Sequence, residues 1–318
     1  MPVPMRLQRS YLAVPGNAER FFAKAADSAA DAIFLDLEDA VAPADKDTAR
    51  RLVVDALNRI DWKRKTMTVR INTLQSAYMF RDVIELVGNC PRLDCLLIPK
   101  VNSARDVYAV ETLLGQVELA CGRAAGVGLE ALIETAEGLC NVEAIAQSSA
   151  RLEAMHFGSG DFAASLGMRT TGIGAVHPGY RVTHEQVGHV QDMWHYAQMR
   201  IVVACRAYGL RPIDGPFGAY TDPTGSAEAA QRAAIIGFEG KQVIHPSQIE
   251  AVNLQFAPSP EEVAYAERII GAMQEAAAAH RGAVSLDGKL IDLVSIRLAN
   301  NIVDKSRRIA QAGNSGQQ

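Results

Sequence analysis

The stretch "IFLDLEDAVAP", residues 33–43, starts as an apolar run and then carries three carboxylates, Asp36, Glu38 and Asp39. An apolar run without strict alternation is typical of a strand buried on both faces of a parallel sheet. A carboxylate at the end of such a strand costs free energy unless a cation or hydrogen-bond donors compensate it. The stretch therefore predicts a buried strand whose carboxyl end carries polar chemistry.

Similar runs recur along the chain, and amphipathic, helix-like segments separate them. The runs lie at 10–16, 32–39, 66–72, 95–100, 128–135, 152–161, 210–218 and 240–246. Helix starts are predicted near Asn17, Asp45, Ser103, Asn141, Trp194, Thr224 and Ser247. About eight β-then-α units in roughly 250 residues are typical of a TIM barrel. We predict an α/β fold, a (β/α)8 TIM barrel over residues 1–258, with an open doubly wound sheet as the alternative.

The remaining residues, 259–318, have a different pattern. A helix is predicted at about 260–279, followed by a hairpin around Asp287-Gly288, because this dipeptide favours a tight turn. A last helix is predicted at about 292–310. We interpret this part as a small C-terminal extension that acts as a lid. The Gly- and His-rich segment 165–192 is predicted to be irregular.

Composition limits the classes of partner. The formal net charge of the 318 residues is −4, so no bulk positive field attracts nucleic acid or an anionic membrane. No segment reaches the ~18 consecutive apolar residues of a membrane-spanning helix. The five cysteines form no C-x-x-C pair, which favours buried, reduced thiols. We expect a cytoplasmic protein that acts on a small molecule, without a nucleic-acid or membrane partner.

In a TIM barrel the carboxyl ends of the strands converge on one face, where active sites lie. Single polar residues at strand ends also occur because strands emerge into solvent. Here, however, nearly every predicted strand ends in polar residues. The residues at these ends are Pro15, Gly16, Asp36, Glu38, Asp39, Arg70, Asn72, Pro99, Lys100, Glu134, Asp161, Asp214 and His245.

Glu134 and Asp161 end adjacent predicted strands, and such a pair suits a hard divalent cation. Mg²⁺ prefers oxygen ligands, often one or two carboxylates completed by water and substrate. A glycoside-hydrolase carboxylate pair is the alternative, which the low aromatic content of 6% disfavours because few rings remain to line a sugar cleft. Arg70 is the candidate partner of an anionic substrate. It could also pair with Asp36 or Glu38, and the two roles are compatible.

Other motifs are excluded by their spacing. The histidines of "HEQVGH", residues 184–189, are five positions apart and would lie on different faces of a helix, unlike those of a zincin. No P-loop and no G-x-S-x-G elbow occurs in the chain. We expect solvated loop side chains rather than metal ligands at His177, His184, His189 and His195.

An ordered series of motifs resembles one known family. The series includes "RSYLAVPG", "FLDLEDAVAP", "VRIN", "LIPKV", "IETAEG", "GSGDFAAS", "RPIDGPFG" and "IHPSQI". These stretches resemble the citrate lyase β-subunit-like (HpcH/HpaI aldolase) superfamily. "SLDGKLIDLVSIR", residues 285–297, extends the resemblance to the malyl-CoA lyases, so that it covers essentially the whole chain.

The resemblance implies a Mg²⁺-dependent enzyme, in which Mn²⁺ can substitute, with a CoA thioester as substrate. The reaction implied is the reversible, Claisen-type cleavage of a 3-hydroxyacyl-CoA, either malyl-CoA or a β-methylmalyl or citramalyl homologue. The products would be an acyl-CoA and glyoxylate or a related 2-oxo acid. A malyl-CoA thioesterase on the same scaffold and a citrate lyase β-type subunit are the alternatives.

The resemblance also implies roles for individual residues. Glu134 and Asp161 would bind the metal, and Arg70 would be catalytic and hold the glyoxylate-like fragment. Asp36 and Glu38 would orient metal-bound water and Arg70. Contacts to the substrate or to CoA would come from Lys24, Gly160, Asp161, Ile244 and His245.

Asp292 would be the catalytic acid/base. In a homo-oligomer, a trimer or a hexamer, the lid would carry it into the active site of a neighbouring subunit. The alternative role of Asp292 is to cap the last helix. Two positions depart from the family pattern: Gln242 stands where malyl-CoA lyases usually have Trp, and Ala18 where some members have Arg.

Overall fold

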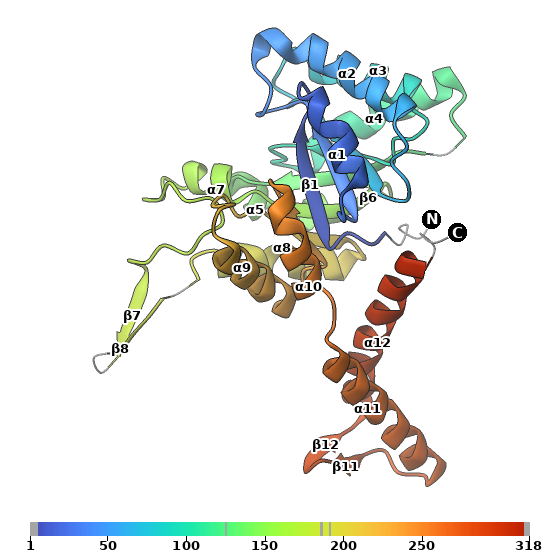
Figure 1. The fold of residues 1–318 in the computed structure, drawn as a ribbon, viewed down its shortest axis with the longest axis vertical. Helices are drawn as coiled ribbons and strands as arrows, with labels where there is room; N and C mark the ends of the chain where they lie inside the picture. The colour runs from blue at the N-terminus through green and yellow to red at the C-terminus, as the bar shows by residue number, and fades with distance from the viewer. Residues whose placement is uncertain (1–5, 125, 185–186, 191, 315–318) are drawn as a thin grey trace. The chain divides into compact units, whose positions relative to one another are not determined.

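The computed structural model describes residues 6–124, 126–184, 187–190 and 192–314. The chain divides into two compact units, Met1–Asn253 and Leu254–Gln318, and each is described by itself (Figure 1). The predicted boundary after residue 258 and the lid role of the second unit stay predictions.

The first unit is a closed barrel of eight parallel strands in the order β1-β10-β9-β6-β5-β4-β3-β2. The predicted (β/α)8 barrel is therefore confirmed, and the open doubly wound sheet is wrong. Each strand falls within one of the eight apolar runs. The strands are β1 (Ser10–Pro15), β2 (Ala32–Asp36), β3 (Thr66–Arg70), β4 (Cys95–Ile98), β5 (Gly128–Ile133), β6 (Leu152–Phe157), β9 (Arg211–Asp214) and β10 (Gly240–Val243).

Helices follow the strands along the chain. Ser103 forms a capping box with Asp106 at the start of α4, as an N-cap serine should, whereas Asp45 makes no side-chain cap bond at α2. The helices are η1 (Glu19–Phe21), α1 (Phe22–Asp27), η2 (Pro43–Asp45), α2 (Lys46–Arg59), α3 (Met79–Asn89), α4 (Ala104–Cys121), α5 (Ala136–Cys140), α6 (Val142–Ala146), α7 (Ser159–Ser165), α8 (His195–Tyr208), α9 (Pro223–Ile235), η3 (Pro246–Gln248) and α10 (Ile249–Gln255).

The segment predicted to be irregular contains a hairpin. Strands β7 (Arg181–His184) and β8 (Val187–Val190) pair in antiparallel register, with Val182 opposite His189. The prediction was wrong at this point because it gave weight to the Gly and His content and not to the β-branched residues, which favour strands.

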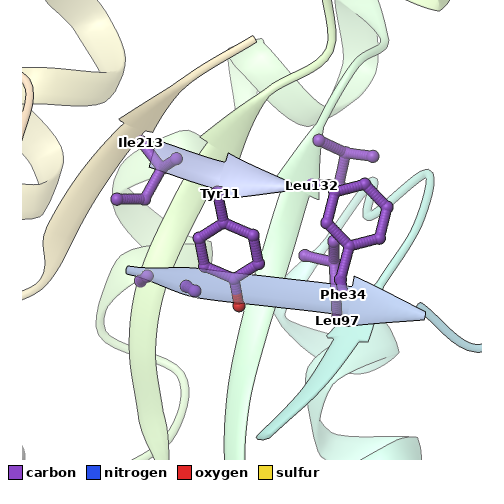
Figure 2. Close-up of a cluster of buried hydrophobic side chains, with 7 residues drawn as sticks. Tyr11, Phe34, Leu97, Leu132 and Ile213 are labelled. Carbon is purple, nitrogen blue, oxygen red and sulfur yellow. The ribbon is translucent and has the colours of Figure 1, made fainter. Parts of the chain in front are cut away.

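A layer of side chains fills the inside of the barrel. It consists of seven buried residues from six strands: Tyr11, Ala32, Phe34, Leu97, Leu132, Ala154 and Ile213. Figure 2 labels Tyr11, Phe34, Leu97, Leu132 and Ile213, whose side chains lie together. The barrel is therefore a packed core and not a channel, as is typical of this fold. Ligands must bind at an end of the barrel.

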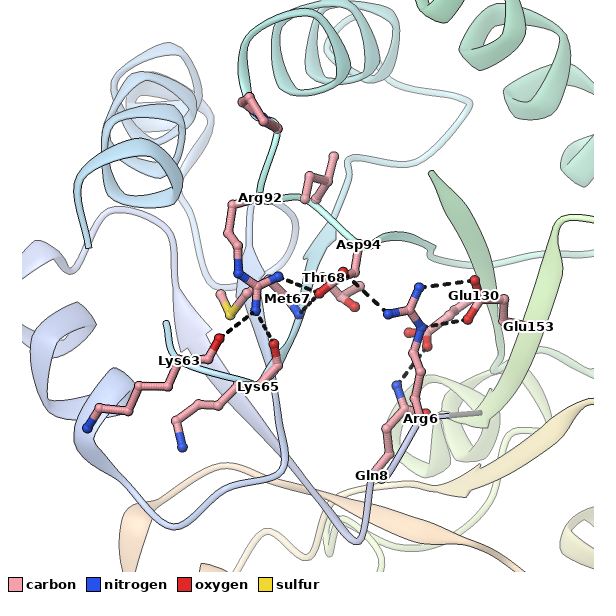
Figure 3. A network of polar contacts seen from close by, with 12 residues as sticks. Arg6, Gln8, Lys63, Lys65, Met67, Thr68, Arg92, Asp94, Glu130 and Glu153 are labelled. Atoms are coloured by element: carbon pink, nitrogen blue, oxygen red, sulfur yellow. Dashed lines mark hydrogen bonds and ion pairs between the residues drawn. The ribbon is translucent and has the colours of Figure 1, made fainter. Parts of the chain in front are cut away.

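A polar network occupies the amino-terminal end of the strands (Figure 3). Arg6 Nε and Arg211 Nη2 both donate to Glu153 Oε2, at 2.7 and 2.8 Å. Glu130 is fully buried and accepts hydrogen bonds from Gln8, at 3.1 Å, and from Tyr11. Burial alone would raise the pKa of Glu130, but interactions with polar and cationic neighbours outweigh it and lower the pKa to about 2.

The second unit is a helical pair joined by a hairpin. It consists of α11 (Pro260–Ala278), β11 (Val284–Leu286), β12 (Lys289–Ile291) and α12 (Leu293–Asn314), close to the predicted elements. Asp287 and Gly288 both have positive φ, as a tight hairpin turn requires. Ala266 of α11 packs against Ala299 and Val303 of α12.

All five cysteines are free thiols, but only three are buried. Cys121 and Cys140 are exposed, so the expectation that the thiols are buried is wrong for these two. Cys121 ends α4 and Cys140 ends the short helix α5, where side chains face outward. Over the described ranges of the chain, no helix is long and apolar enough to cross a membrane.

Glu130→Gln should lower the free energy of unfolding at pH 7 by about 3 kcal/mol, because it removes the anion from a buried charge network. The folded pKa of about 2 lies below the ordinary value of 4.5, so this stabilisation is present above pH 4.5 and lost as pH falls toward 2. Urea unfolding at several pH values measures the difference.

The control is Glu143→Gln, which removes one partner of an exposed ion pair with Arg200 and should change stability by less than ~1 kcal/mol. The unmodified protein and Glu130→Gln should differ less in free energy of unfolding at pH 2.5 than at pH 7. A difference that stays constant over this range would contradict the proposed origin of the stabilisation.

Candidate active site

The carboxyl ends of β2 and β3 are joined by an ion pair. Asp36 and Arg70 are the last residues of these strands and lie opposite each other in register. Arg70 Nε donates to Asp36 Oδ1 at 2.7 Å, and Nη2 donates to Oδ2 at 2.6 Å. The backbone N–H groups of Glu38 and Ala40 donate to the same carboxylate. Burial raises the pKa of Asp36, but Arg70 outweighs burial, and the pKa is lowered.

Arg70 also contacts Glu38, since Nη1 lies 3.1 Å from Glu38 Oε2. The ion pairs with Asp36 and Glu38 that the sequence suggested are therefore both present. A guanidinium has five N–H donors, and three face these two carboxylates. Two donors remain, so substrate binding by Arg70 is compatible with its ion pairs and stays a prediction.

Glu134 is a buried carboxylate directly after β5. Its Oε1 accepts a hydrogen bond from the backbone N–H of Lys100 at 2.8 Å. Burial raises the pKa of Glu134, and the positive charge of Arg70 lowers it. The negative charges of Glu38 and Asp161 raise it as well, and the resulting pKa is about 8. A side chain at Gly158, at the end of β6, would collide with Glu134, so the close approach requires glycine here.

Asp161 lies in the first turn of α7 and is partly buried. It follows β6, which pairs with β5, so Glu134 and Asp161 follow adjacent strands, as the sequence predicted. The negative charge of Asp161 contributes to the raised pKa of Glu134. Their role in metal binding stays a prediction.

We call the charged residues at this end of the barrel the rim cluster. It comprises Asp36, Glu38, Asp39, Lys46, Arg70, Lys100, Glu134 and Asp161. Lys46 belongs to it because its buried Nζ donates to the carbonyls of Leu37 and Glu38, both at 2.7 Å. With every group ionised, five carboxylates face three cations, an excess of two negative charges.

The rim cluster fits a Mg²⁺ ion. Within the described part of the chain, no three or more His, Cys, Asp or Glu residues are grouped to hold a metal. Glu134 and Asp161 could offer a cation two carboxylates, with water or substrate completing its coordination, which is the usual arrangement for Mg²⁺. A divalent cation would balance the excess charge and relieve the raised pKa of Glu134.

The residues expected to contact CoA lie along the same end of the barrel. Lys24 is exposed on α1, after β1, and Ile244 and His245 are exposed after the neighbouring strand β10. The His245 ring stacks on Tyr220 with 4.8 Å between centroids. Gly160 precedes Asp161 in α7. These placements leave CoA binding a prediction.

Gln242 is not part of the rim cluster. Its side chain is buried within β10, and its Nε2 lies 3.0 Å from Nδ1 of His156 on β6. The departure from Trp at this position therefore changes the barrel interior.

Asp292 lies in the second unit, just before α12. Its Oδ1 accepts hydrogen bonds from the backbone N–H groups of Val294 and Ser295, at 2.9 and 3.1 Å, and these bonds lower its pKa. The capping role considered for Asp292 is therefore present. The acid/base role stays a prediction.

The sequence did not indicate what Lys46 and Lys100 do. Both are long cationic side chains whose partners lie on other elements, so no local spacing predicts their contacts. The one available signal was the presence of Lys100 at a strand end.

Comparisons with known proteins agree with the geometry. A family model described as HpcH/HpaI aldolase/citrate lyase matches residues 9–246. The chain is 48% identical over 303 residues, 95% of each chain, to the L-malyl-CoA/beta-methylmalyl-CoA lyase of Rhodobacter capsulatus. It is 35% identical over 307 residues, 96% of this chain and 97% of the other, to the (3S)-malyl-CoA thioesterase of Cereibacter sphaeroides.

A solved structure is also similar. It is the protein CitE from Mycobacterium tuberculosis in complex with magnesium, acetoacetate and coenzyme A. The two chains share 29% identity with a TM-score of 0.74, over 94% of this chain and 98% of the other. The chain belongs to the HpcH/HpaI aldolase/citrate lyase family.

Proposed function

We propose that this protein is a carbon–carbon lyase that cleaves a 3-hydroxyacyl-CoA reversibly into an acyl-CoA and glyoxylate or a related 2-oxo acid. The substrate is malyl-CoA or its β-methylmalyl or citramalyl homologue. The observation that carries the proposal is the buried Glu134 after β5, with Asp161 after the neighbouring strand β6 and Arg70 among the charges that act on Glu134. The 48% identity to an L-malyl-CoA/beta-methylmalyl-CoA lyase supports the substrate class.

Five residues of the rim cluster have a defined task in this reaction. Glu134 and Asp161 hold Mg²⁺, or Mn²⁺ in its place. When bound, the cation supplies positive charge that stabilises the charge developing on the oxygens of the 2-oxo acid fragment. Arg70 grips the carboxylate of that fragment with its two remaining N–H groups. Asp36 and Glu38 fix the guanidinium plane through the ion pairs already described.

The CoA portion of the substrate lies along the rim beyond this cluster. We assign its contacts to Lys24, Gly160, Ile244 and His245, which follow β1, β6 and β10. Lys24 supplies a positive charge for the phosphates. The exposed stack of His245 on Tyr220 offers CoA a flat surface after β10.

Asp292 is the proposed acid/base. In cleavage the 3-hydroxyl group gives up its proton and becomes the carbonyl of the 2-oxo acid. The C2–C3 bond breaks, its electron pair passes to the enolate of the acyl thioester, and a proton must then be added to that enolate at carbon. In the reverse direction a base must remove that proton. Asp292 would deliver this proton as the carboxylic acid in cleavage and remove it as the carboxylate in condensation.

We further propose a homo-oligomer, a trimer or a hexamer, in which the second unit brings Asp292 into the active site of a neighbouring subunit. Large apolar side chains surround Asp292 in sequence and are exposed within the single chain: Leu290, Leu293, Val294 and Leu298. Such a group of exposed side chains is typical of a surface that another protein surface covers.

The thioesterase remains the second candidate, because the (3S)-malyl-CoA thioesterase of Cereibacter sphaeroides matches nearly the whole chain. Incubation of the purified protein with malyl-CoA separates the candidates. We expect glyoxylate and acetyl-CoA without free CoA thiol. Thiol without glyoxylate would instead establish the thioesterase, and absence of both products would favour a subunit role or another acyl group.

Chelation by EDTA should abolish turnover, and Mg²⁺ or Mn²⁺ should restore it. Glu134→Gln should reduce turnover by about 10²-fold or more, the scale on which the loss of one electrostatic contact to the transition state slows an enzyme. Glu137→Gln, three residues along on α5 and exposed, is the matched control and should leave turnover unchanged. A chelated enzyme that turns over normally would exclude the metal role.

Asp292→Asn tests the acid/base role against the capping role. Asn caps a helix about as well as Asp, so the melting temperature should hardly change. Turnover should fall by ~10²-fold or more, because the amide cannot shuttle a proton. Asp287→Asn in the same unit keeps a favourable Asn-Gly turn and is the control. Near-normal turnover of an oligomeric Asp292→Asn would place the acid/base elsewhere.

A further inference from the structure

Lys100 adopts a backbone conformation that is unfavourable for lysine. Its φ is +51°, and it is one of four non-glycine residues with positive φ among those that the structure describes. The left-handed region costs such a residue about 1–2 kcal/mol, because Cβ approaches the carbonyl oxygen. Strain of this kind persists where surrounding interactions enforce it, often at functional sites.

The contacts of Lys100 explain why its left-handed backbone conformation persists. The residue lies just after β4, between the carboxylates that follow β5 and β2. Its backbone N–H binds Glu134 Oε1 at 2.8 Å. Its Nζ contacts Glu38 Oε1 and lies 3.3 Å from both carboxylate oxygens of Asp39. Lys100 therefore binds one carboxylate through its backbone N–H group and two others through its side-chain ammonium group.

Glu38 and Glu134 have different surroundings although they are near each other. Glu38 lies between two cations. Lys100 Nζ donates to Oε1, and Arg70 Nη1 lies 3.1 Å from Oε2, which accepts no hydrogen bond from the described residues. Glu134 Oε1 is held by a neutral N–H group, and Oε2 lies against Gly158. Lys100 contacts both carboxylates, Glu134 through its backbone N–H and Glu38 through Nζ, so the two lie within the span of one lysine residue. A cation attracted by Glu134 would also attract Glu38.

We propose that Lys100 is a positioning residue that keeps Glu38 from becoming a third protein ligand of the metal. Its ammonium occupies the Glu38 oxygen that would otherwise turn to the cation, while its backbone N–H orients Glu134. The metal then retains positions for the substrate oxygens. This inference rests on the proposed function, because it takes Glu134 and Asp161 as the metal ligands.

Loss of Lys100 should therefore strengthen metal binding while it weakens catalysis. In Lys100→Met the ammonium is gone, so Glu38 is released and one repelling charge is removed from the metal site. Mn²⁺ should bind the substrate-free protein about tenfold more tightly, as electron paramagnetic resonance of the free ion measures. Catalytic efficiency (kcat/KM) should fall by ~10²-fold, because Glu38 would then occupy a metal position that the substrate oxygens need.

Three further variants make the test specific. Lys100→Gly also removes the ammonium but relieves the backbone strain, so it should bind Mn²⁺ as tightly as Lys100→Met and provides a second variant if Met folds poorly. Lys100→Arg keeps the charge and should bind Mn²⁺ as the unmodified protein does. Adding Glu38→Gln to Lys100→Met should return the Mn²⁺ affinity to that of the unmodified protein, because the released carboxylate is gone.

Lys63→Met is the matched control. Lys63 also has a positive φ, +54°, and an ion pair, with Asp27, but it precedes β3 at the opposite end of the barrel. Its loss should change neither Mn²⁺ affinity nor turnover. Unchanged or weaker Mn²⁺ binding by both Lys100→Met and Lys100→Gly would overturn the inference. Failure of the unmodified protein to bind Mn²⁺ would instead overturn the proposed metal site.

Discussion

The carboxylate of Asp36 holds together the functional end of the barrel. Both of its oxygens are bound by Arg70, and two backbone N–H groups of the turn after β2 bind them as well. This fixes the turn that carries Glu38, and Glu38 in turn contacts Arg70 and Lys100. Lys100 then connects to Glu134 through its backbone. A buried carboxylate is tolerated at the end of an apolar strand because these donors compensate it.

The two ends of the barrel treat charge in opposite ways. At the amino-terminal end, Glu130 and Glu153 are surrounded by donors such as Arg6 and Arg211, and the pKa of Glu130 is low. At the carboxyl end, carboxylates outnumber cations, and the pKa of Glu134 is high. In TIM barrels, the amino-terminal end typically contributes stability and the carboxyl end carries the active site, and the distribution of charge in this barrel agrees with that division. A substitution in the rim cluster can therefore alter the charge at the carboxyl end and leave the polar network at the amino-terminal end of the barrel intact.

The fold could be predicted from the sequence because buried parallel strands are apolar runs with polar ends, and all eight were found. The Asp287-Gly288 turn and the Ser103 cap have local signals that were also sufficient. Strand adjacency brought Glu134 and Asp161 together in the prediction. Side-chain partners over long distances could not be predicted, because the reach of a lysine depends on the folded backbone. The positive φ of Lys100 had no signal either, since lysine does not favour that region.

The raised pKa of Glu134 has a thermodynamic consequence. At pH 7 a carboxyl group with a pKa of about 8 is mostly protonated, and a metal ion binds only the ionised form. If Glu134 is a metal ligand, as proposed, each cation that binds there must displace a proton to the solvent. The heat of metal uptake measured by calorimetry then includes the ionisation enthalpy of the buffer, and the apparent affinity rises as the solution becomes more alkaline. A single buried carboxyl group would in this way couple occupancy of the proposed metal site to the pH of the solution.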